Sequence, residues 1–332
     1  MAEVTSDVTQ IAADDFGDVD STLQLSLATS LTSLRSSVQA YHEENGRTYH
    51  ALSAGKYLFP NDDSELDRLD IQHSLFRLTL DDRLCLSPKN DGAKRVLDVG
   101  TGTGIWAIDY ADNHPEAKVI GIDLSPVQSS FLPPNCSFEI DDIEKEWTWN
   151  EPFDFIFSRT LAGSFSDTQA FIQKAYDNLE PGGYLEMEDI ALPVTSDDGT
   201  LAEDSFLARM SHMTTEAAEK LGRRIDLSPT YKGMFEAAGF VDVVIKRFKW
   251  PSNMWPRDKK FKEMGRWNFA NIDPGLEGLT LALFTRGLGI SREETLAFCE
   301  GARREIRDVK IHAYWPIIVC YGRKPGNNKA PE

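Results

Sequence analysis

Short apolar runs alternate with helix-like stretches through the middle of this 332-residue chain. The runs are almost continuously apolar, which is typical of strands covered on both faces. They occupy residues 96–99, 117–124, 137–140, 153–158 and 184–190. Apolar positions at helical spacing lie between them, for example from Ile105 to Ala111. Strands that alternate with helices at this spacing predict a parallel, doubly wound α/β sheet.

The two flanks follow other patterns. Residues 1–25 are acidic and contain no basic residue, so we expect a disordered tail there. In residues 26–92 we expect an N-terminal helical segment that covers the ligand site of the central domain. Its first helix begins near Leu23 and ends at about Tyr41, and the second begins near Asp62 or Ser64 and runs past Leu80.

The final third contains two more β-forming runs, at 240–250 and 312–321, with helical patterns between them. We interpret these runs as the last strands of a seven-stranded sheet, and residues 251–310 as a helical cap inserted before the last strand. The central domain then spans 93–324, and 325–332 form a flexible tail.

One predicted strand, 96–99, ends in a glycine-rich turn. Glycines at 100, 102 and 104 alternate with threonines, and a helix begins directly after them. Glycine permits positive φ and a close approach of backbone to a ligand, so strand, turn and helix N-terminus form a nucleotide-type cradle. The third glycine of a dinucleotide fingerprint would fall at Ile105, and no phosphate-loop lysine is present.

Acidic residues stand at the ends of three successive strands. Asp98 precedes the turn, where it would suit a positively charged amine better than a pyrophosphate. Asp123 closes the second strand, where a carboxylate can accept hydrogen bonds from ribose hydroxyls. Asp142 and Ile143 follow the third strand and could hold an adenine. A ligand with a ribose, an adenine and a cationic amino acid, but no phosphate, is S-adenosylmethionine.

The motifs around these acids resemble those of class I methyltransferases, which have a Rossmann-like fold. Neighbouring segments narrow the resemblance to the fungal LaeA-like (TAM-domain) family, over about residues 40–324. That family includes a nuclear regulator of secondary metabolism and many enzymes encoded in biosynthetic gene clusters. The matching segments are Val96-Leu-Asp-Val-Gly-Thr-Gly-Thr-Gly104, Ile120-Gly-Ile-Asp-Leu-Ser125, Phe138-Glu-Ile-Asp-Asp-Ile143, Leu179-Glu-Pro-Gly-Gly-Tyr184, Asn45-Gly-Arg-Thr-Tyr-His50, Lys56-Tyr-Leu-Phe-Pro-Asn61, Leu69-Asp-Ile-Gln-His73 and His312-Ala-Tyr-Trp-Pro316.

The resemblance implies a role for each strand end. The first turn would line the methionine part of the cofactor, the second strand end the ribose and the third the adenine, and Ser158 with Arg159 would lie beneath the transferring methyl group. Thr168 stands where the family usually carries a tryptophan, which implies a changed pocket wall. The expected cofactor-binding residues are Asp98, Gly100, Thr101, Gly102, Gly104, Asp123, Leu124, Asp142, Ile143, Ser158, Arg159 and Tyr49.

Methyl transfer from a sulfonium is an in-line displacement that needs no metal and depends on positioning, with a base where the acceptor must lose a proton. Three residues are candidates for catalysis and four for binding the acceptor, and each could equally be an ordinary structural residue. The catalytic candidates are His73, Glu188 and Arg159, and the acceptor candidates are His50, His212, Trp255 and Trp267. The segment Phe157-Ser-Arg-Thr160 lacks the Pro-Pro motif of amide and nucleobase methylators, which weighs against those acceptors.

Composition narrows the possible partners. A net charge of −18 argues against nonspecific nucleic-acid binding. No apolar run approaches the roughly 18 residues that span a bilayer, and the first residues lack the pattern of a signal peptide. Four scattered cysteines form no Cys-x-x-Cys pair, so we expect no structural zinc and a reducing compartment, cytoplasmic or nuclear.

Three functions remain open on the sequence. The first is an S-adenosylmethionine-dependent methyltransferase acting on an oxygen or nitrogen, less readily a carbon, of a small molecule such as a fungal secondary metabolite. The second is a nuclear regulator that works with protein partners. The third is a methyltransferase fold that catalyses a different reaction. The oligomeric state is left open by the sequence.

Overall fold

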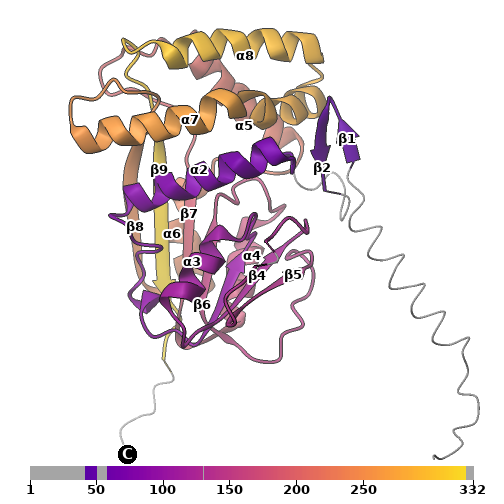
Figure 1. The fold of residues 1–332 in the computed structure, drawn as a ribbon, viewed down its shortest axis with the longest axis vertical. Coiled ribbons are helices and arrows are strands. Elements are labelled where there is room, and N and C mark those ends of the chain that lie inside the picture. The colour runs from indigo at the N-terminus through magenta and orange to yellow at the C-terminus, as the bar shows by residue number, and fades with distance from the viewer. Residues whose placement is uncertain (1–41, 51–57, 130, 327–332) are drawn as a thin grey trace, which may run out of the picture.

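The computed structural model describes residues 42–50, 58–129 and 131–326. Within these residues, seven strands form one sheet in the order β5-β4-β3-β6-β7-β9-β8 (Figure 1). The predicted seven-stranded α/β fold is therefore confirmed. The strands are β3 (Arg95–Val99), β4 (Lys118–Asp123), β5 (Cys136–Ile140), β6 (Phe153–Arg159), β7 (Leu179–Ile190), β8 (Val241–Pro251) and β9 (Tyr314–Arg323).

One strand departs from the expected parallel arrangement. β3 to β7 pair in parallel, but β9 runs antiparallel to both of its neighbours, β7 and β8. After β8 the chain leaves the sheet for the helices between residues 251 and 314, and it re-enters the sheet at the same end, where Pro251 pairs with Tyr314. The last strand therefore runs in the opposite direction.

The helices fall into two groups (Figure 1). α3 (Ile105–Asn113), α4 (Thr168–Asp177) and α6 (Tyr231–Ala238) cover the faces of the sheet. α5, α7 and α8 gather beyond the ends of β8 and β9, and α2 crosses between them and the sheet. We call α5, α7 and α8, with the π-helical turn after α7, the cap. Their bounds are α2 (Asp63–Thr79), α5 (Phe206–Lys220), α7 (Lys259–Ala282), π turn (Leu283–Leu288) and α8 (Arg292–Arg307), with short 3-10 turns at Pro88–Asn90 and Ser228–Thr230.

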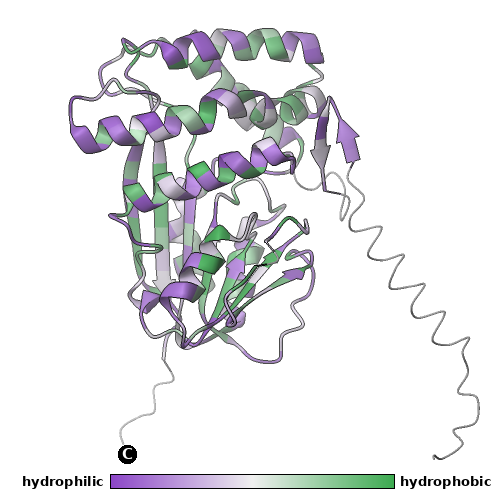
Figure 2. Cartoon of the chain, viewed as in Figure 1, coloured by the Kyte–Doolittle hydropathy of each residue, from purple (hydrophilic) through white to green (hydrophobic). Residues whose placement is uncertain are grey.

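Side-chain caps fix where the helices begin. Ser205 accepts a hydrogen bond from the Ala208 N–H, so α5 begins at Phe206. Ser291 and Glu294 form a full capping box at α8. Polar and apolar residues alternate along the cap helices, while the strands are largely apolar (Figure 2).

The segment before α2 differs from the helical prediction for 26–92. A hairpin of β1 (His42–Glu44) and β2 (Arg47–Tyr49) turns at Asn45 and Gly46, both with positive φ. Asn-Gly is a strong signal for a two-residue hairpin, and periodicity alone missed it. The helix predicted before residue 42, the acidic tail and the last six residues lie outside the described residues.

β7 also begins earlier than predicted. It starts at Leu179, so Pro181, Gly182 and Gly183 lie inside the strand and not before it. An irregularity in the pairing between Phe153 and Phe155 accommodates them. None of the helices in the described part of the chain has an apolar stretch long enough to cross a membrane.

The core beneath the glycine turn is aromatic. Trp106 of α3 stacks on Phe157 of β6 with ring centroids 3.8 Å apart, and its Nε1 donates to the Leu84 carbonyl over 2.8 Å. This buried stack ties α3 to the sheet at the position where the turn ends. It holds the turn against the carboxyl ends of the strands.

Candidate active site

Two adjoining cavities lie at the carboxyl edge of the sheet. The first, about 1200 Å³ and open to solvent, is bounded by the ends of β3 to β6 and by residues 60–72; we call it the strand-end cavity. The second, about 1050 Å³, lies between α2, α5, α7 and the ends of β7 to β9; we call it the cap cavity. Leu69, Gln72 and Thr160 line both.

The three glycines of the turn have different tasks. All adopt positive φ. A Cβ on Gly100 would lie 2.4 Å from Leu161, and one on Gly104 would lie 2.3 Å from the Phe138 ring, so both allow close packing. Gly102 lines the cavity, and a Cβ there would meet Leu69 at 3.4 Å. Gly100, Thr101 and Thr103 line the cavity beside it, whereas Gly104 caps α3 and does not line the cavity.

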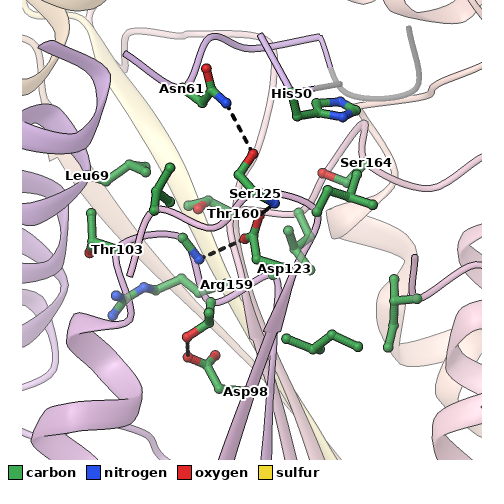
Figure 3. A pocket seen from close by; sticks show the side chains of 18 of the residues that line it. His50, Asn61, Leu69, Asp98, Thr103, Asp123, Ser125, Arg159, Thr160 and Ser164 are labelled. Carbon is green, nitrogen blue, oxygen red and sulfur yellow. Dashed lines mark hydrogen bonds between the residues drawn. The ribbon is translucent and has the colours of Figure 1, made fainter. Parts of the chain in front are cut away.

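Asp123 stands at the centre of the strand-end cavity (Figure 3). Its carboxylate accepts the Gly102 N–H and the Ser125 N–H, each over 2.9 Å. Ser125 in turn accepts from the Asn61 side chain over 3.2 Å. An ionised carboxylate has about four lone-pair positions, so capacity remains for two vicinal hydroxyls such as those of a ribose.

Asp98 lies at the bottom of this cavity and is almost fully buried (Figure 3). It accepts a 2.5 Å hydrogen bond from the Thr101 hydroxyl. Burial raises the pKa of Asp98 to about 7, against the lowering effect of the Thr101 bond and of the Arg159 charge. A bound ammonium group would stabilise the ionised form, so the position suits the amino group of a methionine.

Asp142 and Ile143 line the far side of the cavity beyond β5. Asp142 is buried and accepts the Glu144 N–H over 3.1 Å. Leu124 and Ile143, which follow Asp123 and Asp142 in the chain, contribute apolar surface to the same cavity. At the ends of β3, β4 and β5 the cavity therefore offers the Asp98 carboxylate for an ammonium group, the Asp123 carboxylate for hydroxyl groups, and apolar surface with Asp142 as a hydrogen-bond acceptor. That order matches S-adenosylmethionine.

Arg159 belongs to a chain of polar side chains that links three elements. His73 Nδ1 lies 2.9 Å from an Arg159 guanidinium nitrogen, and His73 Nε2 lies 2.9 Å from an Asp109 oxygen. A guanidinium can only donate, so Nδ1 must accept and Nε2 must carry the proton given to Asp109. Burial lowers the pKa of His73 and favours this neutral form.

This arrangement corrects the prediction of His73 as a catalytic residue. Its Nδ1 lone pair is occupied by Arg159, and the ring lines neither cavity. Arg159 does line the strand-end cavity, near Asp98 and Thr103 (Figure 3). His73 thus positions the guanidinium, which can bind a carboxylate such as that of a methionine.

Glu188 is corrected as well. It is fully buried on β7, where its backbone pairs with that of Arg159, and it lines neither cavity. Burial, followed by the neighbouring charge of Glu186, raises the pKa of Glu188 well above its usual value. Glu186 accepts the Leu86 and Ser87 N–H groups. The structure thus places Glu188 in the core behind the strand-end cavity, where burial favours its protonated form.

Five other predicted residues lie away from both cavities or face other groups. Tyr49 is buried beneath the Arg286 guanidinium, 5.0 Å from its ring, and Ser158 is enclosed within the sheet. Trp255 stacks on His312, and Trp267 packs against the cluster around Trp250. His212 is exposed on α5.

The helical phase explains the position of His212. The side chains of α5 that face the cap cavity are at 207, 210, 211 and 214, which share one side of a helix. Residue 212 follows 211 by about 100° and turns outward. His50, in contrast, does line the strand-end cavity, above Asp123 and close to Ser164 (Figure 3).

Several cavity residues were missed from the sequence. Gln72 lies one position before the suspected His73, and the choice between them depends on which side of α2 faces the site. Thr160 has a positive φ of 53° and donates its N–H to the Glu188 carbonyl over 2.7 Å. Such backbone conformations often mark functional positions, but a threonine gives no sign of them in the sequence. The tryptophans of the cap cavity are Trp250 and Trp315.

The proteins that this chain resembles in sequence include methyltransferases, in agreement with the cofactor site described above. Residues 71–244 match the family model described as a methyltransferase domain. Methyltransferase pytC of Aspergillus terreus is 44% identical over 89% of this chain and 92% of its own length. The probable methyltransferase tdiE of Emericella nidulans is 35% identical over 87% and 90%. The secondary metabolism regulator LAE1 of Cochliobolus heterostrophus is 37% identical over 85% and 94%.

The methyltransferase family match, together with Asp98, Asp123 and Asp142 along the strand-end cavity, confirms S-adenosylmethionine as the cofactor. The match with pytC extends over nearly the whole of both chains, cap included. The chain belongs to the methyltransferase-domain family, in its LaeA-like fungal group, and is an S-adenosylmethionine-dependent methyltransferase.

Proposed function

We propose that this chain transfers the methyl group of S-adenosylmethionine to an oxygen or nitrogen of a small molecule held in the cap cavity. The observation that carries the proposal is the junction of the two cavities at Leu69, Gln72 and Thr160. An acceptor in the cap cavity can therefore meet a methyl group presented from the strand-end cavity. Relatives described as fungal methyltransferases support a secondary metabolite as the acceptor.

The residues of the chain act mainly by binding and orienting. Bound S-adenosylmethionine supplies an electrophilic methyl group on a sulfonium. Asp98 and Arg159 would hold the two charged groups of its methionine, and Asp123 the ribose hydroxyls. With both reactants held, the reacting atoms can lie about 3 to 3.5 Å apart, which accounts for much of the rate of such transfers.

The cap cavity offers no obvious base. Among the described residues that line it, Asp189 is the sole carboxylate, and it already accepts the Tyr231 hydroxyl over 2.7 Å and the Ala162 N–H over 2.9 Å. We therefore expect an acceptor that needs little help in losing its proton, such as a phenol, an enol or an amine.

The proposal is tested with methyl-labelled S-adenosylmethionine, the purified chain and an organic extract of a fungal culture, beside a parallel reaction with fungal protein lysate. The expected result is label in a small molecule, absent when Asp123→Ala replaces the wild type. Label confined to protein would overturn the proposal in favour of a protein acceptor.

The four cysteines are buried free thiols, and we expect the enzyme to work in a reducing compartment, the cytoplasm or the nucleus.

A further inference from the structure

The charged residues on the wall of the cap cavity are already bonded within the protein. In the described part of the wall these are Arg68 and Asp189. Arg68 binds both oxygens of Glu65, at 2.9 and 2.7 Å, and the Asn271 side-chain oxygen at 2.7 Å. Asp189 is bonded as described above, and burial raises its pKa to about 6. Arg68 is therefore committed to Glu65 and Asn271, and each oxygen of Asp189 already accepts a hydrogen bond, so neither group is set up as a counter-ion for a charged ligand.

The remaining wall is mostly apolar. It combines aliphatic side chains with the faces of three aromatic rings, and its other polar groups are hydroxyls and amides. A charged group that entered would lose its hydration without a partner, which proteins avoid. The apolar lining residues are Phe59, Leu69, Ala162, Ile190, Leu192, Val194, Leu207, Met210, Ile225, Trp250, Ile272, Leu276, Leu279 and Trp315.

Thr160 and Gln72 are the polar residues at the junction with the strand-end cavity, and of the two Gln72 carries an amide that can both donate and accept hydrogen bonds. Its side chain lines both cavities and is only 3% exposed. Within the ranges that the structure describes, its amide makes no hydrogen bond to the protein. Other polar residues of the cap wall are bonded to the protein: Ser211 accepts the Val194 N–H, and Thr214 donates to the Met210 carbonyl.

A buried amide without a protein partner is costly unless a ligand or cavity water satisfies it. At this place the ligand is whatever lies next to the methyl group. The amide oxygen can accept a hydrogen bond from an O–H or N–H and so direct the lone pair of that atom towards the neighbouring cavity.

On the basis of the proposed function, we propose that the acceptor is an uncharged, predominantly apolar molecule and that Gln72 orients its reacting O–H or N–H group by a hydrogen bond. The cap wall excludes carboxylates, phosphates and ammonium groups, and Gln72 selects the atom that meets the methyl group. Gln72 is then a residue that determines specificity for the transfer.

The proposal that the cap cavity excludes charged ligands, which we call the charge rule, is tested with two fluorescent dyes that share one skeleton. N-phenyl-1-naphthylamine is neutral and has one N–H, and 8-anilinonaphthalene-1-sulfonate adds a sulfonate. With the chain saturated by S-adenosylhomocysteine, the neutral dye should bind at least tenfold more tightly, and Ile272→Trp, which fills the cavity, should abolish its binding. Equal binding of the two dyes, or binding that survives Ile272→Trp, would overturn the rule.

The role of Gln72 is tested by transfer of label into a fungal extract that is first separated by ion exchange at pH 7 into an acidic (anionic), a basic (cationic) and a neutral (uncharged) fraction. Label should enter the neutral fraction, and Gln72→Met should lower kcat/KM for that acceptor about tenfold or more while the Kd for S-adenosylhomocysteine changes less than twofold. Gln173→Met, the same change at an exposed site on α4, is the matched control.

The outcomes separate the two proposals. Label in the acidic or basic fraction, or a full transfer rate in Gln72→Met, would overturn this inference while leaving methyl transfer intact. Absence of label in every fraction would count against the proposed function, and the dye comparison would still decide whether the cavity accepts neutral molecules.

Discussion

The two cavities differ in how they are built from the chain. The strand-end cavity is assembled from short segments that each follow one strand, so neighbouring residues in the sequence share a task. The cap cavity draws on α2, α5, α7 and three strands, and its wall comes from residues between 59 and 315. The strand-end cavity is the more polar of the two and is specified locally, whereas the cap cavity is more apolar and is specified by how distant helices pack.

This difference explains why the cofactor is common to the family while the acceptor can vary. A carboxylate at a strand end is fixed by the backbone that precedes it. An apolar wall changes with any substitution on the helices that surround it, at little cost to the sheet. The following predictions test whether the two cavities are separate in stability, in binding and in pH dependence.

The largest effect is expected where α2 meets α7 at the wall of the cap cavity. Arg68→Met leaves Glu65, which is 2% exposed, without its partner, and should lower the free energy of unfolding by about 3–5 kcal/mol. Urea denaturation followed by circular dichroism measures this loss. Arg266→Met breaks the same spacing of charges with Glu263 at the surface and should cost under about 0.5 kcal/mol. Equal losses would show that the buried pair does not support the cap.

The next effect is expected in the strand-end cavity. Asp123→Ala removes the acceptor for two hydroxyls and should weaken S-adenosylhomocysteine binding by about 100-fold, on the order of 3 kcal/mol, in calorimetry. Binding of the neutral dye in the cap cavity should not change. Asp112→Ala, which removes the same charge from an exposed position on α3, serves as the control. Wild-type affinity in Asp123→Ala would refute the ribose assignment.

Binding of the cofactor should also depend on pH, whereas dye binding should not. Asp98 has a pKa of about 7 in the free protein, so it is protonated below that pH and cannot pair with an ammonium group until it ionises. The affinity for S-adenosylhomocysteine should therefore fall about tenfold per pH unit below 7 and level off above it. Asp98→Asn should bind weakly at every pH, and a pH-dependent Asp98→Asn would contradict the assignment.

The same shift bears on stability with the opposite sign. The pKa of Asp98 is higher in the folded chain than in the unfolded one, so the folded chain holds more protons between about pH 4 and 7. The contribution of this group to stability is present at low pH and is lost as the pH rises through 7. Denaturation of the cofactor-free protein at pH 6 and pH 8, with Asp98→Asn alongside, measures it.

The smallest effect is expected at His73. In His73→Asn the amide oxygen can replace Nδ1 and still accept from Arg159, so the KM for S-adenosylmethionine should stay within about twofold. His73→Gln places its amide near the Nε2 position and should raise that KM about fivefold, with kcat changed less. Steady-state kinetics distinguish this positioning role from a general base, for which both variants would lose kcat alike.

The sequence was sufficient for the fold and for the cofactor because both depend on local patterns. Asp98, Asp123 and Asp142 could be located by counting from predicted strands. Gln72 and His73 are adjacent on one helix, and which of them faces the cavity depends on how α2 rolls against α7. Glu188 ends in the core because β7 is covered on both sides there. Tertiary packing, which no single segment encodes, decides such cases.

The register of β8 and β9 has a consequence for how the enzyme could diversify. Trp250 pairs directly with Trp315, so the 64-residue excursion between them leaves and re-enters the sheet at one point. Closing a longer or shorter loop between fixed ends changes the chain entropy only slowly with its length. The excursion can therefore be exchanged as a unit between relatives, and chimeras cut at these two tryptophans would replace the α7 wall of the cap cavity while α2, α5 and the cofactor scaffold stay unaltered.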